Sequence, residues 1–421
     1  MSAPPARPTS LFRNAFGPGL LWASAAIGVS HLVQSTRAGA DAGFGLAWVI
    51  LAALVLKYPF FEYGPRYAAA TGESLVEGYL RVGRWALWLY LLITVSTAVI
   101  IQVAVVLFTA FVARLVFGLP WSLPVTAAAV VAVCAGLLMV GRFRGLDLAA
   151  KAIIVLLSVS TLFAATVAIG RADVSTLAPW PIGGDRVAFP FILALVGWMP
   201  SAIDIAVWSS LWTLAKNRAT GGRASVAHAL LDFRIGYVGT GLLAFAFVVL
   251  GAGVMHGSGA GFSAQGTQFS VQLVDLYGQT LGVWMRPVVL VAMLTTMFST
   301  SLTVVDGFPR AIARTVGVAR RGLGATPDDE GPVYWISGAV LGTLTVLVVA
   351  RLIGTLTAMV DFATIVSFFT APALGYLNLR VVTASHVPAE ARPGRALRVL
   401  SMLGLVLLAG TAAIYLVTVF R

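Results

Sequence analysis

Charged residues and cysteine are both scarce in this sequence. Only 10% of its 421 residues are charged, whereas a soluble domain typically carries about 25% because its surface faces water. The single cysteine, Cys134, lies inside an apolar run, so an intrachain disulfide is excluded. With 59% hydrophobic residues and a mean hydropathy of +0.93, the chain is expected to contact lipid, not water, over most of its surface.

A basic domain, a signal peptide and the common catalytic motifs are also absent. The net charge of +12 is spread between apolar runs, which is typical of membrane topology and argues against nucleic-acid binding. The proline-rich segment Met1 to Ser10 lacks the layout of a cleaved signal peptide. Neither His-Glu-x-x-His nor Gly-x-Ser-x-Gly occurs, and the four histidines are widely separated. We therefore expect neither an enzyme nor a bound cofactor.

Long apolar stretches dominate what is present. A spanning helix needs about 20 mostly apolar residues, and eleven stretches qualify. They cover approximately residues 16–40, 43–69, 85–116, 123–141, 148–170, 188–214, 231–255, 280–308, 333–351, 354–379 and 397–420. Long soluble loops are missing, so the sequence predicts one all-α integral domain with about eleven transmembrane helices. The stretch from His256 to Gln272 is expected to be an uncharged connector.

The basic residues alternate between the two sides of these predicted helices. If the N-terminus is cytoplasmic, 21 of the 28 basic residues fall on inner segments, as the positive-inside rule requires. Lys57 and Arg66 belong to this inner group, while Arg37 falls inside the first predicted helix. The pattern predicts a multi-pass protein of the cell membrane with its N-terminus in the cytoplasm and its C-terminus outside.

Two of the predicted helices contain signals for an interruption. The first opens Phe16-Gly-Pro-Gly-Leu-Leu and reaches Gly28-Val-Ser-His at mid-length, and the sixth reaches Gly197-Trp-Met-Pro-Ser at a similar depth. Proline removes a backbone donor and clashes with the preceding turn. Paired interruptions in two halves of a chain indicate a transporter's substrate site. Their spacing predicts two inverted five-helix repeats, about 16–170 and 188–379, with an extra helix at 397–420.

These motifs resemble the Nramp family. The resemblance rests on Phe16-Gly-Pro-Gly-Leu-Leu, Ala38-Gly-Ala with Gly43, the Met199-Pro200 pair and the eleven predicted helices. It implies the inverted-repeat fold of the leucine-transporter type and transport of divalent metal ions, usually with protons. The family motifs are Asp-Pro-Gly-Asn in the first helix and Met-Pro-His in the sixth.

The sequence departs from both family motifs. Gly28 stands where the family has its metal-binding aspartate, Ser30 at the motif's glycine, and His31 at its asparagine. Met199 is retained, but Ser201 replaces the histidine. Hard divalent ions prefer charged oxygen ligands, whereas a thioether and an imidazole suit softer ions. The resemblance therefore implies a divergent branch with an altered binding motif, in which His31 and Met199 are the candidate metal ligands.

Ionisable residues at membrane depth are costly and are functional candidates by default. Asp204 lies one turn beyond Pro200 and is predicted to meet a cation, an amine or a proton. The predicted substrate-binding residues are Gly28, Ser30, His31, Met199, Ser201 and Asp204. The predicted coupling or gating residues are Arg37, Glu62, Asp306 and Asp361. Several of these residues have a plainer alternative. For His31 it is a hydrogen bond to a backbone carbonyl, and for Arg37 and Asp204 it is an ion pair with each other. For Glu62 it is pairing with Lys57 or Arg66.

Two kinds of cargo and one other function remain open from the sequence. The resemblance favours an alternating-access transporter of a divalent metal cation. The altered motif favours the same fold carrying a small organic solute such as an amine, with Asp204 as its counter-ion. A receptor that does not transport is a third hypothesis. The expected partners are the transported cation or solute and membrane lipid, without nucleic acid.

Overall fold

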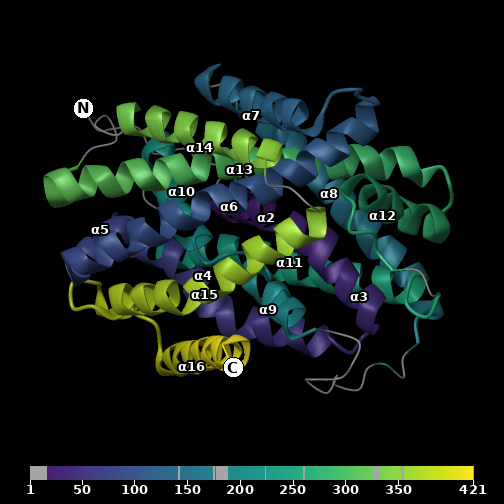
Figure 1. Ribbon diagram of the computed structural model, residues 1–421. Helices are drawn as coiled ribbons and strands as arrows, with labels where there is room; N and C mark the ends of the chain where they lie inside the picture. The colour runs from purple at the N-terminus through teal and green to yellow at the C-terminus, as the bar shows by residue number, and fades with distance from the viewer. Residues whose placement is uncertain are drawn as a thin grey trace, which may run out of the picture.

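The computed structural model describes residues 17–140, 143–173, 176, 188–222, 224–258, 261–325, 331–351 and 355–420 (Figure 1). All regular secondary structure in these ranges is helical, which confirms the all-α prediction. The segment Met1 to Ser10, for which no signal peptide is predicted, lies outside the described residues.

Eight continuous helices of the described chain are long and apolar enough to cross a membrane. They are α4 (Ala47–Thr71), α6 (Arg84–Phe117), α7 (Leu123–Val140), α11 (Val226–Val254), α13 (Met285–Arg321), α14 (Gly331–Arg351), α15 (Leu356–Thr383) and α16 (Arg395–Val419). Each coincides with one of the predicted spans. These eight helices confirm a polytopic membrane architecture.

The other three predicted spans have a different form. The fifth corresponds to α8 (Phe143–Ala168), which continues into the short helix η2 (Ile169–Arg171). The first consists of α2 (Pro18–Ala26), the π-helix η1 (Ser30–Ser35) and α3 (Thr36–Ala42). The sixth consists of α9 (Phe189–Gly197) and α10 (Ile205–Thr220). Both predicted interruptions are therefore confirmed, while the count of eleven spans stays a prediction.

Two short helices were not predicted, and one long helix runs further than expected. Helix α5 (Leu75–Val82) begins at a capping box, in which Ser74 and Glu77 satisfy each other's backbone groups. Helix α12 (Gly266–Leu281) occupies part of the predicted connector, so that prediction was wrong. Helix α13 continues through Pro309 to Arg321. An interior proline removes one backbone hydrogen bond and clashes with the carbonyl four residues back, yet α13 continues past Pro309.

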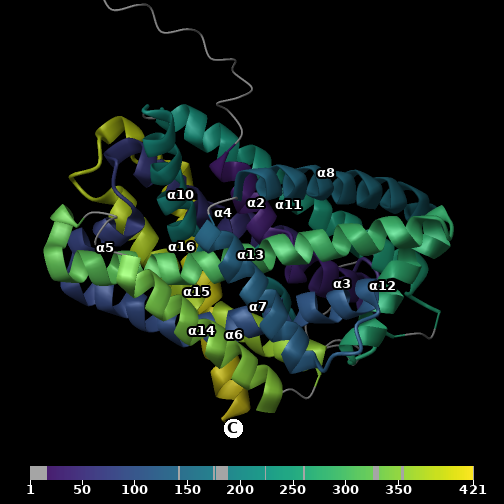
Figure 2. The same cartoon turned by 90° about the horizontal axis from the view of Figure 1, so that it is seen from above.

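The two interrupted helices run antiparallel to each other. Helix α2 contacts α10, and η1 contacts α9, so the first half of each interrupted helix meets the second half of the other. Helix α11 packs along the first interrupted helix through contacts with α2, η1 and α3. Figure 2 shows α2 and α3 within the bundle between longer helices. An inverted repeat requires this crossed pairing, although the repeat boundaries stay a prediction.

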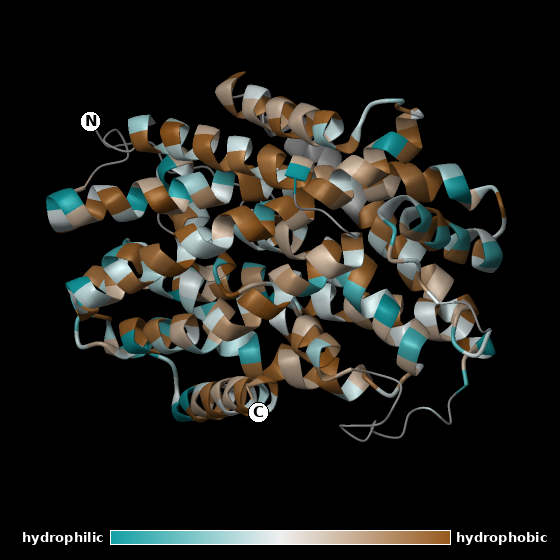
Figure 3. Ribbon diagram, viewed as in Figure 1, coloured by the Kyte–Doolittle hydropathy of each residue, from teal (hydrophilic) through white to brown (hydrophobic). Residues whose placement is uncertain are grey.

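The outer helices expose apolar side chains along their length. Leu92, Val406 and Ile336 are each more than 60% exposed, which in water would be strongly unfavourable. Hydrophobic colours cover most of each helix, whereas hydrophilic colours gather toward the two ends of the bundle (Figure 3). The apolar flanks are therefore the surface that faces lipid.

Candidate functional site

A small cavity lies between the two interruptions. It measures about 40 Å³, which holds about three water molecules at ~10–15 Å³ each. Its wall is formed by helices α2, α6, α10 and α13 and by residues of the two interruptions. The lining residues are Ala25, Ala26, Val29, Ser30, Ile101, Val105, Trp198, Ser201, Ala202, Asp204, Ile205, Trp208, Thr300, Val304 and Phe308.

Asp204 is the acidic residue in this wall. It stands directly before α10, and its side chain is 2% exposed. One carboxylate oxygen, Oδ1, has no hydrogen-bond partner in the described chain, and neither has the indole nitrogen of Trp208 across the cavity wall. A buried carboxylate oxygen without a partner is unfavourable. A cation or a protonated group in the cavity would satisfy it.

The interruption in the first helix is held by close packing at Gly28. Helix α2 ends at Ile27, whose backbone is extended, and Gly28 accepts backbone hydrogen bonds from His31 and Leu32. A Cβ atom at Gly28 would lie 2.9 Å from the Thr300 hydroxyl on α13. Thr300 also lines the cavity and donates toward the Ile27 carbonyl at 3.2 Å. A hydroxyl of α13 thus fills the space beside Gly28.

His31 is completely buried, and both of its ring nitrogens have partners. Nδ1 lies 2.8 Å from the Ser30 hydroxyl, and Nε2 lies 3.0 Å from the Thr240 carbonyl on α11. His31 is thus bonded to a backbone carbonyl, which is the plainer alternative to a role as a ligand. His31 would coordinate a metal ion only after giving up one of these two bonds. Its role as a metal ligand stays a prediction.

The sixth helix is interrupted from Trp198 to Asp204. The Met199–Pro200 peptide bond is cis, and the Pro200 carbonyl faces the Ser30 hydroxyl at 3.3 Å. Ser30 also donates to the Ala26 carbonyl at 2.9 Å. Met199 is fully buried but does not belong to the cavity wall, so its predicted role as a ligand remains untested.

The structure brings together part of the predicted substrate site. Ser30, Ser201 and Asp204 line one cavity, whereas Gly28, His31 and Met199 lie behind its wall. Sequence reasoning missed Trp198, Trp208 and Thr300, which also line it. Trp198 stands directly before the Met-Pro pair, and this position was a usable signal. The polar run that includes Thr300 is visible in the sequence, but helix–helix hydrogen bonding explained it there. Nothing in the sequence marked Trp208, because its place in the wall depends on how α10 packs.

Arg37 and Asp361 form an ion pair across the bundle. The Arg37 guanidinium contacts both carboxylate oxygens, at 2.8 and 3.3 Å. Gln34 joins them, donating to Asp361 at 3.0 Å and accepting from Arg37 at 3.1 Å. The guanidinium also stacks on the Phe191 ring at 4.6 Å. The partner of Arg37 is therefore Asp361 and not Asp204, and the contact joins the first, sixth and tenth predicted spans.

Glu62 and Asp306 each bind an arginine four residues later on the same helix. Glu62 pairs with Arg66, not with Lys57. Asp306 contacts Arg310 at 2.7 Å and accepts from the Tyr334 hydroxyl at 2.8 Å. Local pairing accounts for both carboxylates, and their coupling role stays a prediction.

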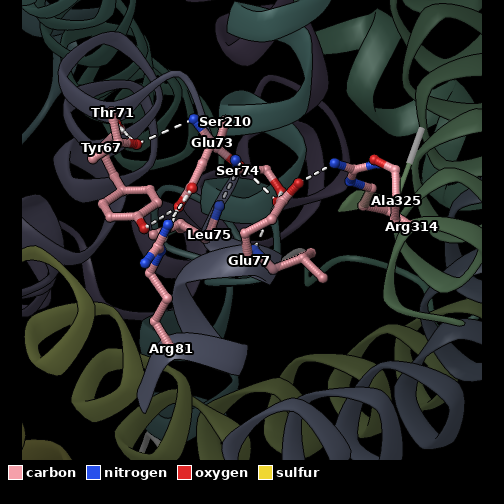
Figure 4. A network of polar contacts seen from close by, with 11 residues as sticks. Tyr67, Thr71, Glu73, Ser74, Leu75, Glu77, Arg81, Ser210, Arg314 and Ala325 are labelled. Carbon is pink, nitrogen blue, oxygen red and sulfur yellow. Dashed lines mark hydrogen bonds and ion pairs between the residues drawn. The ribbon is translucent and has the colours of Figure 1, made fainter. Parts of the chain in front are cut away.

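The segment between α4 and α5 ties several helices together (Figure 4). The amide of Leu75 donates to the Ser210 hydroxyl on α10 at 3.1 Å. Glu77 forms an ion pair with Arg314 on α13, and Arg314 also donates to the Ala325 carbonyl at 3.2 Å. In Figures 1 and 2, α5 and α3 lie at opposite ends of the bundle. The interrupted helices are thus held at both ends, by this network and by the Arg37–Asp361 pair.

Replacing Glu77 by glutamine is expected to lower the free energy of unfolding by roughly 3 kcal/mol, because a buried arginine would lose its counter-charge. Glutamine still completes the capping box, so the loss reports the ion pair with Arg314. The measurement is thermal unfolding in detergent. Glu73→Gln is the matched control, since the Glu73–Arg81 pair is 24% and 33% exposed and such pairs contribute at most about 1 kcal/mol. Equal losses in both variants would contradict the prediction.

Comparison with known proteins places the chain in a family. Residues 19–418 match the family described as natural resistance-associated macrophage protein-like. This chain belongs to the Nramp family. The match covers nearly the whole sequence and confirms the resemblance seen in the helix-one and helix-six motifs.

Two curated proteins are similar in sequence to this Nramp-family chain. The uncharacterized protein PM0681 of Pasteurella multocida (strain Pm70) is 35% identical over 415 residues, covering 96% of this chain and 92% of that protein. The metal transporter Nramp6.2 of Populus trichocarpa is 32% identical over 108 residues, covering 25% of this chain and 19% of that protein.

Solved structures share the fold. A manganese transporter of Eremococcus coleocola superposes with a TM-score of 0.68 at 14% identity, covering 98% of this chain and 88% of that one. MHP1, a nucleobase-cation-symport-1 family transporter, superposes with a TM-score of 0.54 at 17% identity, covering 87% and 77% of the two chains. At these identities the superpositions establish the fold. Together with the family, they support a metal-ion transporter rather than an enzyme.

Proposed function

We propose that this protein is an alternating-access transporter that moves a divalent metal cation, with Asp204 as the carboxylate that meets the cargo. The observation that carries the proposal is the unpartnered Asp204 oxygen beside a small cavity between two interrupted helices. Membership of the Nramp family supports metal as the cargo. The hydroxyls of Ser30 and Ser201 line the same cavity and supply further oxygen donors.

The binding site is an altered one in this proposal. In the described part of the chain, no three His, Cys, Asp or Glu side chains come together. A cation at Asp204 would therefore meet one carboxylate and otherwise neutral oxygens, which predicts weaker binding than a cluster of carboxylates provides.

Calorimetry with Mn²⁺ and Mg²⁺ on purified protein tests the proposal. Saturable Mn²⁺ binding that is lost in Asp204→Asn supports it, whereas binding by the variant at parental affinity contradicts it. His31→Ala and Met199→Ala, measured in parallel, decide whether these two predicted ligands take part. Asp275→Asn is the control, because its carboxylate pairs with Arg286 at 2.7 Å outside the cavity.

A small organic cation is the second candidate cargo. Three aromatic side chains, Trp198, Trp208 and Phe308, share the cavity wall with the one carboxylate. Aromatic faces attract organic ammonium groups, and a single carboxylate suffices as counter-ion. Uptake of radiolabelled methylammonium into proteoliposomes, without Mn²⁺ uptake, would establish this alternative in place of metal. A protein that transports neither, but still binds one of them, would fit the receptor hypothesis.

We further propose that the Arg37–Asp361 pair closes one side of the cargo pathway. The pair connects α3, and through Phe191 also α9, to α15, so opening on that side must separate the two charges. The predicted topology places this ion pair on the outer side of the membrane.

Reversing either charge of this pair is expected to reduce uptake more than tenfold, because like charges would face each other in a partly buried contact. The double variant Arg37→Asp, Asp361→Arg is expected to recover uptake to within about fivefold of the parent, the remaining loss reflecting the broken contacts with Gln34 and Phe191. Uptake into proteoliposomes is the measurement. A double variant no better than the worse single variant would contradict a paired role.

A further inference from the structure

The sequence grouped Lys57 with the charges of the inner face, but the structure places it elsewhere. Lys57 lies in the middle of α4 and is fully buried. Its ammonium nitrogen, Nζ, donates to the backbone carbonyls of Val196, Gly197 and Ser201, each at 2.9 Å. Two of these carbonyls belong to the last residues of α9, and the third belongs to the non-helical segment that follows it.

The arrangement of these carbonyls is that of a cation-binding site. Val196 and Gly197 end helix α9, whose last carbonyls carry the negative end of the helix dipole, and the Val196 carbonyl also accepts from the Met199 amide at 3.3 Å. The Ser201 carbonyl comes from the non-helical segment that follows. The three carbonyl oxygens each lie 2.9 Å from Nζ. They therefore match the three N–H donors of an ammonium group.

Among the described residues, no side chain neutralises this ammonium group. Lys57 forms no ion pair with any carboxylate of the described chain, and the neighbouring Glu62 is bound to Arg66 and lies 3.7 Å from Arg234. The ring of Phe61 lies 5.6 Å from Nζ. A buried charge is costly unless its surroundings compensate it, so the backbone dipoles of the interruption provide the compensation.

Close packing fixes the position of these carbonyls. A Cβ atom at Gly197 would clash with the Thr364 carbonyl on α15, and one at Gly64 would clash with the Ala206 carbonyl on α10. Helix α9 therefore approaches α15 at backbone distance beside one of the three carbonyls, and α4 approaches α10 equally closely about two turns beyond Lys57. Ser201 also lines the cavity that contains Asp204, so the filled site and the cavity share a residue.

We infer that the interruption of the sixth helix is a cation site whose permanent occupant is the Lys57 ammonium group. Lys57 acts as a positioning residue, holding Ser201 and the end of α9 in the geometry that forms the cavity wall. The inference goes beyond the proposed function, because it concerns a cation that belongs to the chain and not the cargo. Once the side chain is removed, the site should accept a small monovalent cation of the ammonium class.

The test is chemical rescue of Lys57→Ala. Its melting temperature is measured in detergent with ammonium, ethylammonium or choline chloride at equal ionic strength. We expect a loss of at least ~5 °C that ammonium or ethylammonium restores saturably and choline does not, while the parent protein responds equally to all three salts. Equal responses of Lys57→Ala to the three salts, or no response, would overturn the inference.

Two further variants keep the result decisive if Lys57→Ala is poorly folded. Lys57→Met fills the space of the side chain without its charge, so we expect a similar loss without rescue by any salt. Parental stability of Lys57→Met would refute the inference. Lys216→Ala, which removes another lysine, is expected to show no selective rescue.

An uptake arm separates this inference from the proposed cargo. Small ammonium ions are expected to raise cargo uptake by Lys57→Ala at least tenfold over choline, and to leave uptake by the parent unchanged. If the parent transports no metal, the proposed function fails, while the stability experiment still decides the role of Lys57.

Discussion

Replacing Asp204 by asparagine is expected to reduce Mn²⁺ uptake at least ~100-fold while leaving the fold intact. Two unit charges ~4 Å apart attract each other by about 4 kcal/mol at an effective dielectric constant of ~20, and 1.4 kcal/mol corresponds to a tenfold change in affinity. A buried carboxylate with an unpartnered oxygen offers this attraction to the cargo. Asparagine retains the shape but not the charge.

Initial rates of uptake into proteoliposomes, with melting temperatures of the same preparations, provide the measurement. Asp275→Asn is the matched control and is expected to keep uptake within about threefold of the parent, because the Asp275 carboxylate pairs with Arg286 at 2.7 Å and lies outside the cavity wall. Uptake by Asp204→Asn within threefold of the parent would show that the cargo does not depend on this charge, and the proposed site would then be wrong.

Replacing Gly197 by alanine is expected to prevent formation of the native structure or to destabilise it by more than ~3 kcal/mol. The new Cβ atom would occupy the position of the Thr364 carbonyl on α15. Inserting one methyl group into a close-packed interior typically costs about 1–3 kcal/mol when side chains can yield. Here the neighbour is backbone inside a helix, so relief requires α9 and α15 to separate.

The measurement is the monodisperse fraction in size-exclusion chromatography, followed by thermal unfolding. Gly239→Ala on α11 is the matched control, because a Cβ atom there meets no atom within 4 Å and alanine has the higher helix propensity. The control is expected to be as stable as the parent or more so. If Gly197→Ala behaves like this control, the close approach of α9 and α15 does not hold the interruption.

Much of the architecture was predictable because its signals are local in the chain. The apolar runs gave the positions of α4, α6, α7, α11, α14, α15 and α16. Gly28 and Pro200 marked both interruptions. Helices α5 and α12 escaped prediction because they are short and lack long apolar runs. Helix α13 continues past the predicted apolar span of about 280–308, through Pro309 to Arg321.

The resemblance motif at the start of the first helix has a packing explanation. The amides of Gly17 and Gly19 donate to the Asp232 carboxylate on α11, at 3.4 and 2.9 Å. A Cβ atom at Gly19 would clash with the Asp232 carbonyl. The Gly-Pro-Gly sequence thus lets the N-terminal end of α2 approach α11, although the paired residues are more than 200 positions apart in the sequence.

The sequence by itself determined an all-α membrane protein, its family, its two interrupted helices and Asp204 as an ionisable residue near one of them. All of these depend on composition, on motifs or on spacing along the chain. Only the tertiary structure decided that Arg37 faces Asp361, that Thr300 fills the space beside Gly28 and that Lys57 binds the carbonyls of the sixth helix. These contacts join distant segments, and their partners are set by how helices pack, which local sequence does not encode.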